Sequence, residues 1–234
     1  MAKKNINLYE GEETAVQSVA KAPLSKLEEI EQFIFNAGSD DVPTFGGQDI
    51  PGSIQCQQVP DELAPCILKI LESGTPVKSY LEIGSAAGGS AFLINHFLKP
   101  EKIVLVDDNQ HPKAHIRQYI LADVQREEIV GSSHADETRG KINALGLLFD
   151  CLMVDGDHFY EGAKDDVDYY GTLVKPGGFL IFHDSTVNKP YGCYQVFQEL
   201  KKDKKWKFIA EYVSEKYNKC GIGLFQKGSV SYED

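Results

Sequence analysis

The chain has 234 residues, enough for one α/β domain with an extension, since a typical domain takes about 100 to 200 residues. Its 24 basic and 35 acidic residues give a net charge of −11, which disfavours a nucleic-acid partner. No apolar run approaches the roughly 18 residues of a membrane helix, and the N-terminus lacks the apolar core of a secretory signal. Five scattered cysteines are expected to be reduced thiols. We expect a cytoplasmic protein without membrane or nucleic-acid partners.

The first 60 residues are predicted to be a helical and loop extension of the main domain. Apolar residues recur there at helical spacing, at Leu24, Leu27, Ile30, Phe33 and Ile34. A segment dense in glycine, proline and aspartate follows and favours a loop. We interpret the extension as a candidate lid or oligomer contact, which makes a homo-oligomer a candidate assembly.

Residues 61–234 are predicted to form one domain. A helix is expected in PDELAPCILKILESG, and seven short apolar runs follow it: SYLEIG, KIVLVDD, EEIVGSS, DCLMVDGD, GGFLIFHD, KFIAEYV and CGIGLFQ. The first five are nearly continuous in hydrophobic residues, which is typical of parallel strands buried on both faces. The predicted fold class is α/β, a doubly wound sheet of seven mostly parallel strands, with the last two forming a hairpin.

The stretch YLEIGSAAGGSA has the form of a strand-to-helix turn around a ligand. A dinucleotide fingerprint needs a glycine where this chain has Ala86, and a P-loop needs a G-K-[ST] that does not follow. The turn suits a cofactor that carries an amino acid and a nucleoside but no phosphate. Asp107 lies 23 positions after Gly84, at the end of the next strand, and suits the two hydroxyls of a ribose. A dehydrogenase would use the same aspartate.

Five segments together resemble the class I S-adenosylmethionine-dependent methyltransferases: YLEIGSAAGGSAFLI, KIVLVDD, IVGSSHAD, FDCLMVDGDHFYEGAKDDVDYY and LVKPGGFLIFHDS. They look most like the small-molecule O-methyltransferases of the macrolide-sugar and catechol types, over roughly residues 57–226. The resemblance implies a Rossmann-like methyltransferase fold and S-adenosylmethionine as cofactor. It implies contacts to the methionine part from Gly84, Ser85 and Ser90 with support from Glu82, to the ribose from Asp107, and to the adenine from Ser132, Ser133 and His134.

A second group of polar residues follows the fourth and fifth predicted strands. Methyl transfer to a hydroxyl requires its deprotonation, which a divalent cation and a nearby base both assist. The resemblance implies that Asp155 and Asp184 bind the metal and that His158 is the base. Because both proposed ligands are carboxylates and magnesium prefers oxygen ligands, we expect a magnesium ion. The third protein ligand stays open. The sugar branch has a glutamate at the position of His183, and the catechol branch has an asparagine at the position of Ser185. We take His183 as the candidate third ligand.

The acidic residues beyond Asp155 have a simpler interpretation. Asp157, Asp165, Asp166 and Asp168 are assigned to a helix N-terminus and its solvent face, where negative charge complements the helix dipole. Strand-end aspartates also cap helices, which is the structural alternative for the metal pair.

The sequence thus predicts methyl transfer from S-adenosylmethionine to a hydroxyl of a small-molecule acceptor, assisted by a divalent metal. Two alternatives stay open. A nicotinamide-dependent oxidoreductase would share the sheet and Asp107, and a cofactor-binding module without catalysis would keep the glycine turn but not need the second group.

Overall fold

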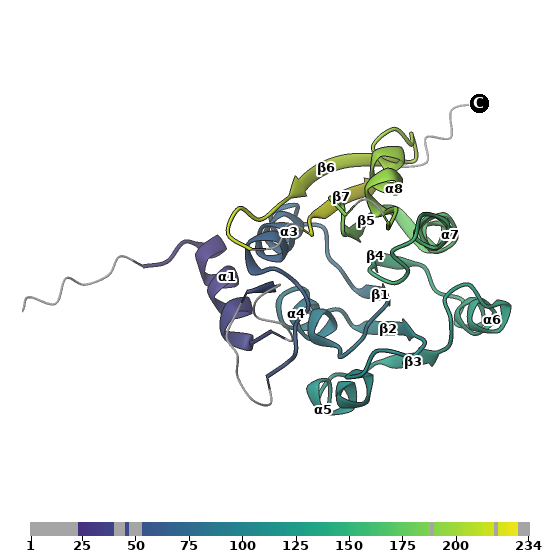
Figure 1. Ribbon diagram of the computed structural model, residues 1–234, viewed down its shortest axis with the longest axis horizontal. Helices are drawn as coiled ribbons and strands as arrows, with labels where there is room; N and C mark the ends of the chain where they lie inside the picture. The colour runs from purple at the N-terminus through teal and green to yellow at the C-terminus, as the bar shows by residue number, and fades with distance from the viewer. Residues whose placement is uncertain (1–22, 40–44, 47–52, 188–189, 218–219, 229–234) are drawn as a thin grey trace, which may run out of the picture.

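The computed structural model describes residues 23–39, 45–46, 53–187, 190–217 and 220–228 (Figure 1). These residues form one seven-stranded sheet with helices on both faces, which confirms the predicted fold class. Within the described ranges, no helix combines the length and the apolar character needed to cross a membrane.

The strand order places a ligand site at the middle of the sheet. The strands lie in the order β3 (Glu127–Val130), β2 (Lys102–Asp107), β1 (Ser79–Ile83), β4 (Phe149–Val154), β5 (Val174–His183), β7 (Ile222–Lys227) and β6 (Trp206–Tyr212). The first five are parallel, and β7 runs antiparallel to both of its neighbours, so the predicted hairpin of the last two strands is confirmed. The order reverses between β1 and β4, the switch point at which such sheets bind ligands.

Two apolar layers fix the helices to the sheet. One face is covered by α1 (Lys26–Ala37), α3 (Pro60–Glu72), α4 (Gly89–Leu98) and α5 (Arg117–Ile120), preceded by the short η1 (Ala114–Ile116). The other face is covered by α6 (Asp136–Ala144), α7 (Tyr160–Tyr170), followed by η2 (Gly171–Leu173), and α8 (Cys193–Leu200). Because the strands are buried on both faces, their polar residues gather at the strand ends.

The predicted N-terminal helix is confirmed as α1. Ser25 caps it, since its hydroxyl accepts from the Glu28 amide while the Glu28 carboxylate accepts from the Ser25 amide. Ile30 and Ile34 are buried in the same apolar cluster as α3 and α4. The helix is therefore part of the core on this face, and its role as a lid or an oligomer contact stays a prediction. Most of the loop predicted after it lies outside the described residues.

Candidate functional site

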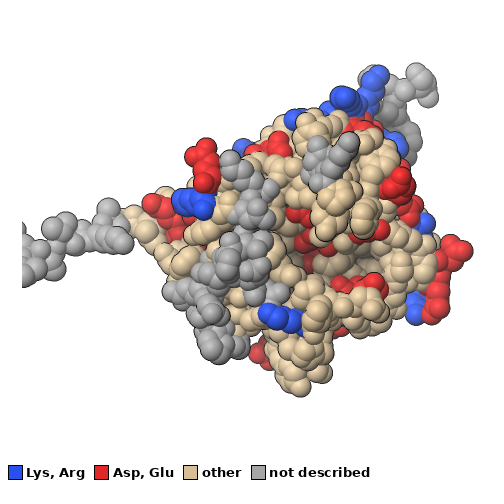
Figure 2. All heavy atoms as spheres, in the orientation of Figure 1, with Lys and Arg blue, Asp and Glu red and all other residues tan. Residues whose placement is uncertain are grey.

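A cavity of about 660 Å³ opens at the carboxyl ends of the parallel strands. Figure 2 shows it as a hollow near the middle of the face, with acidic side chains at its edge. Each of the five parallel strands contributes a lining residue at or just beyond its end, in strand number order Gly84, Asp107, Ser132, Asp155 and His183. The volume lies in the range of about 300 to 1,000 Å³ that is typical of small-molecule sites.

The glycine turn after β1 is held close to the end of β4. Gly84 has a φ of +85°, and a Cβ atom there would lie 2.0 Å from the carbonyl oxygen of Asp155. Glycine is therefore required by the approach of two backbones. Gly84 lines both the large cavity and a neighbouring recess of about 10 Å³, whereas Ser85 and Ser90 line the recess alone. Sequence reasoning grouped these three residues, and the structure places them on two connected surfaces of the same turn.

Glu82 lies beneath this turn, fully buried on β1. Its carboxylate accepts hydrogen bonds from the Tyr80 hydroxyl at 2.6 Å and from the Ser90 hydroxyl at 2.5 Å. Burial raises the pKa of Glu82 to about 7, because its effect is larger than that of the two hydrogen bonds, which lower the pKa. Glu82 thus ties the strand end to the first turn of α4, and its support of cofactor binding stays a prediction.

Both carboxylate oxygens of Asp107 accept a hydrogen bond from a backbone amide. Its Oδ2 accepts from the Ala86 amide and its Oδ1 from the Asn109 amide, each at 2.7 Å. The buried Arg117 guanidinium lies 3.5 Å from Oδ1 and donates to the Ala86 carbonyl at 2.6 Å. Each carboxylate oxygen can accept a second hydrogen bond, so the Asp107 carboxylate is oriented and still able to accept from a ligand.

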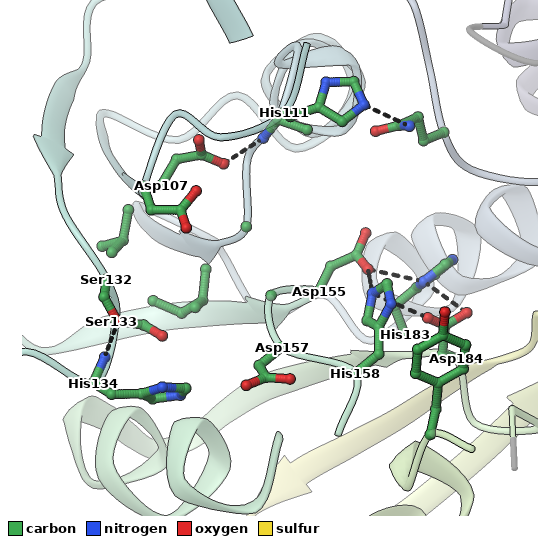
Figure 3. Close-up of a pocket in the computed structure, with 18 of the residues that line it drawn as sticks. Asp107, His111, Ser132, Ser133, His134, Asp155, Asp157, His158, His183 and Asp184 are labelled. Atoms are coloured by element: carbon green, nitrogen blue, oxygen red, sulfur yellow. Dashed lines mark hydrogen bonds and ion pairs between the residues drawn. The ribbon is translucent and has the colours of Figure 1, made fainter. Parts of the chain in front are cut away.

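The loop after β3 forms the far wall of the cavity, where Ser132, Ser133 and His134 all line it (Figure 3). The Ser133 carbonyl accepts from the Tyr170 hydroxyl at 2.6 Å and from the Arg139 side chain at 3.1 Å. Arg139 belongs to α6 and Tyr170 to α7, so the two helices together fix the backbone of this loop beside the cavity.

Asp166 is fully buried, so its assignment to the solvent face of a helix is wrong. Its Oδ1 lies 3.2 Å from His134 Nε2, and burial raises its pKa to about 6. The position faces inward because α7 turns this side chain toward the loops after β3 and β4. Asp165 and Asp168 are partly exposed and pair with Arg139 and Lys164, as expected of a solvent face.

Four charged side chains meet at the ends of β4 and β5 (Figure 3). His183 Nδ1 lies 2.9 Å from Asp155 Oδ1 and 3.3 Å from Asp184 Oδ1. His158 Nε2 lies 3.2 Å from Asp184 Oδ2 and 3.7 Å from Asp155 Oδ1. The predicted convergence of Asp155, His158, His183 and Asp184 is therefore what the structure shows.

These neighbours shift the pKa values of the cluster. Burial would raise the pKa of Asp155, but the two imidazoles outweigh burial and hold it below its ordinary value. Interaction with Asp155 raises the pKa of His158 despite partial burial. Burial would lower the pKa of His183, but the two carboxylates raise it well above its ordinary value. The carboxylates therefore make both imidazoles stronger bases.

Among the described residues, two sets of three have ligand atoms within 4.8 Å of one another. Asp155, His158 and Asp184 form one set, and His183, Asp184 and Cys220 form the other. The two predicted carboxylates thus fit a divalent cation, with an imidazole beside them. Ser185 is fully buried, and its hydroxyl donates to the Glu211 carboxylate at 2.9 Å.

Sequence reasoning missed two residues of this region. Gln58, 2% exposed, donates from Nε2 to Asp155 Oδ2 at 2.8 Å, and Cys220 lines the cavity. Neither carries a sequence signal, because one lies in a loop before α3 and the other in a scattered set of cysteines. Tyr191 also lines the cavity, and its ring is perpendicular to that of His158 with the ring centroids 5.9 Å apart.

The fold and the site define an α/β protein with a cavity for a small molecule at the switch point of its sheet. Residues 81–185 match a family model described as a methyltransferase domain. The match spans the strands and loops that line the cavity, and it confirms the resemblance to the class I methyltransferases.

The chain is also similar to individual proteins in sequence or in fold. An uncharacterised protein of Acanthamoeba polyphaga mimivirus is 25% identical over 112 residues, which cover 45% of this chain and about half, 51%, of that protein. The O-methyltransferase TomG of Streptomyces achromogenes, involved in tomaymycin synthesis and solved with S-adenosylmethionine, has a TM-score of 0.56 at 18% identity, covering 91% of this chain and 93% of its own. MycE of the mycinamycin pathway was solved with magnesium, S-adenosylhomocysteine and mycinamycin VI. It has a TM-score of 0.54 at 14% identity, and the match covers 89% of this chain and 55% of MycE. At these identities the two structures show a shared fold.

Proposed function

We propose that the protein transfers a methyl group from S-adenosylmethionine to a hydroxyl of a small-molecule acceptor. The observation that carries the proposal is that one cavity is lined both by the glycine turn with Asp107 and by His158 with its two carboxylates. The first group suits the cofactor and the second suits deprotonation of an acceptor.

The cofactor half is supported by residues that are already oriented. Asp107 is held by two backbone amides with acceptor capacity left for a ribose. Ser132 and Ser133 line the wall beyond it, next to His134, where the adenine would lie. The complex of TomG with S-adenosylmethionine supports the same cofactor here.

The reacting half is supported by the position of His158. Its side chain is 42% exposed and lines the cavity, so an acceptor hydroxyl can approach the imidazole from there. In the proposed reaction the hydroxyl gives its proton to the neutral imidazole of His158, and its oxygen forms a bond to the methyl carbon. The carbon–sulfur bond breaks with its electron pair going to sulfur, which leaves S-adenosylhomocysteine.

Asp155 and Asp184 are the proposed ligands of a divalent cation, in particular magnesium, with His183 as the candidate third ligand. When bound, such an ion lowers the pKa of a coordinated hydroxyl. The magnesium in the MycE complex supports the proposal. His158 is also a candidate metal ligand together with Asp155 and Asp184. One imidazole nitrogen cannot both accept a proton and bind a metal, so metal binding by His158 would compete with its role as a base.

Apolar and aromatic side chains also line the cavity, among them Phe45, Val187 and Tyr191. Such a surface favours an uncharged, partly apolar acceptor that presents its hydroxyl to His158.

Calorimetry with S-adenosylmethionine and S-adenosylhomocysteine, followed by transfer of a labelled methyl group to pooled hydroxyl compounds, tests the proposal. We expect binding of both ligands, methylation of a hydroxyl acceptor, and loss of turnover with a chelator that magnesium reverses. Absence of binding would refute the cofactor, and full turnover in excess chelator would refute the metal.

A further inference from the structure

His183, Asp184 and Cys220 come together through the pairing of β5 with β7. His183 ends β5 and pairs with Ile222 of β7, so Cys220 lies just beyond the paired ends. Two backbone hydrogen bonds of 3.1 Å fix this crossing, from Ser185 to Gly221 and from Thr186 to Cys220. All three residues are buried, with 5%, 6% and 5% exposure in chain order, and each offers a ligand atom within 4.8 Å of the others.

The imidazole of His183 is oriented as a metal ligand would be. Its Nδ1 lies at ion-pair distance from the carboxylates of Asp155 and Asp184. Within the described residues, neither of its buried ring nitrogens has a hydrogen-bond partner of good geometry. Buried polar atoms normally have a partner. Metal-binding histidines usually have a carboxylate facing one imidazole nitrogen while the other nitrogen holds the metal.

The donor set indicates the kind of ion. A thiolate and an imidazole are ligands of zinc and of the neighbouring transition metals, whereas magnesium prefers oxygen ligands alone. We propose that His183, Asp184 and Cys220 bind a divalent transition ion of the zinc type, with Asp155 orienting His183. The Cys220 thiol loses its proton to solvent when the sulfur binds the ion.

This inference stands apart from methyl transfer, because it concerns three side chains that bind an ion whatever the reaction. It shares Asp184 and the candidate third ligand His183 with the proposed magnesium site; Asp184 Oδ2 faces His158 and its Oδ1 faces His183. The zinc-type ion and the magnesium ion are therefore alternative occupants of one cluster at the wall of the cavity.

The test uses the full chain, freed of metals with a chelator. Calorimetry should show one equivalent of zinc bound per chain, at least about tenfold more tightly than magnesium. Cobalt added to the same protein should produce the near-ultraviolet absorption band of a thiolate bound to cobalt. Cys220→Ser should remove this band and weaken zinc binding about tenfold or more, and Asp155→Asn should weaken binding about 10- to 100-fold but keep the band.

Cys66→Ser is the matched control, because Cys66 is also a buried cysteine but lies within α3. It should keep both the band and the zinc affinity. Zinc binding no tighter than that of magnesium, a cobalt complex of wild type without the thiolate band, or unchanged binding by Cys220→Ser would each overturn the inference. The wild-type cobalt spectrum decides the matter if Cys220→Ser does not fold.

Discussion

Gly84 and Asp155 approach each other so closely that no side chain fits between them. A Cβ atom on Gly84 would lie 2.0 Å from the Asp155 carbonyl oxygen, and the Asp155 amide in turn donates to the Ile83 carbonyl at 2.9 Å. The contact joins β1 to β4 at the switch point of the sheet. It therefore couples the glycine turn, the proposed cofactor side of the cavity, to the Asp155 carboxylate on the proposed reacting side.

Gly84→Ala should lower the free energy of unfolding by about 3 kcal/mol or more, because the methyl group overlaps backbone atoms that cannot move without breaking the strand pairing. Gly146→Ala is the control, since Gly146 also has a positive φ but a methyl group there would have nothing within 4 Å. It should lose only about 1 kcal/mol, from the strain of a left-handed backbone. Urea unfolding of both variants measures the difference, and equal losses would contradict the close approach.

Asp107→Ala should weaken the binding of S-adenosylhomocysteine by about 1 to 3 kcal/mol, because the ribose hydroxyls lose a charged acceptor. The amides of Ala86 and Asn109 also lose their partner, so the melting temperature should fall as well. Calorimetry and thermal unfolding separate the two effects. Asp108→Ala removes the neighbouring, exposed carboxylate and should cost less in both. A larger loss of affinity in the Asp108 variant would assign the ribose to that residue instead.

Much of the site could be predicted because parallel strands point the same way. Once the apolar runs that became β4 and β5 were recognised, their ends had to meet at one edge of the sheet, and Asp155 and Asp184 had to lie near each other. The same reasoning placed Asp107 and Ser132 on the wall of the cavity.

The rest depends on contacts between segments far apart in the chain. Gln58 reaches Asp155 from 97 positions away, and Cys220 reaches the end of β5 only because β7 inserts between β5 and β6. No periodicity or spacing encodes either contact. The burial of Asp166 was missed for a related reason: a run of aspartates is typical of an exposed face, and the loops that cover this one are set by the tertiary fold.

Glu82 should make the protein less stable as the pH rises from about 4.5 to about 7. Its pKa is about 7 in the folded protein against an ordinary 4.5, so in this interval the folded state binds more protons than the unfolded state and the free energy of unfolding falls. Above pH 7 the loss is complete. Glu82→Gln should remove up to about 3 kcal/mol of this decrease. The measurement is urea unfolding at several pH values, with Glu101→Gln as an exposed control; parallel curves for wild type and Glu82→Gln would contradict the buried carboxylate.

His158→Ala should lower turnover about a hundredfold or more, the usual contribution of a general base, while the affinity for S-adenosylhomocysteine stays nearly constant. Because Asp155 and Asp184 raise the pKa of His158, the wild-type rate should rise with pH through an apparent pKa above the usual 6.5, and this rise should vanish in the variant. A metal that lowers the acceptor's own pKa produces a similar profile, so the variant decides. His115→Ala, an exposed histidine on η1, should keep both the rate and the profile. If His158→Ala retains most of its activity with its acceptor, deprotonation must come from a metal or from His183, and the proposed division of roles within the cluster is wrong.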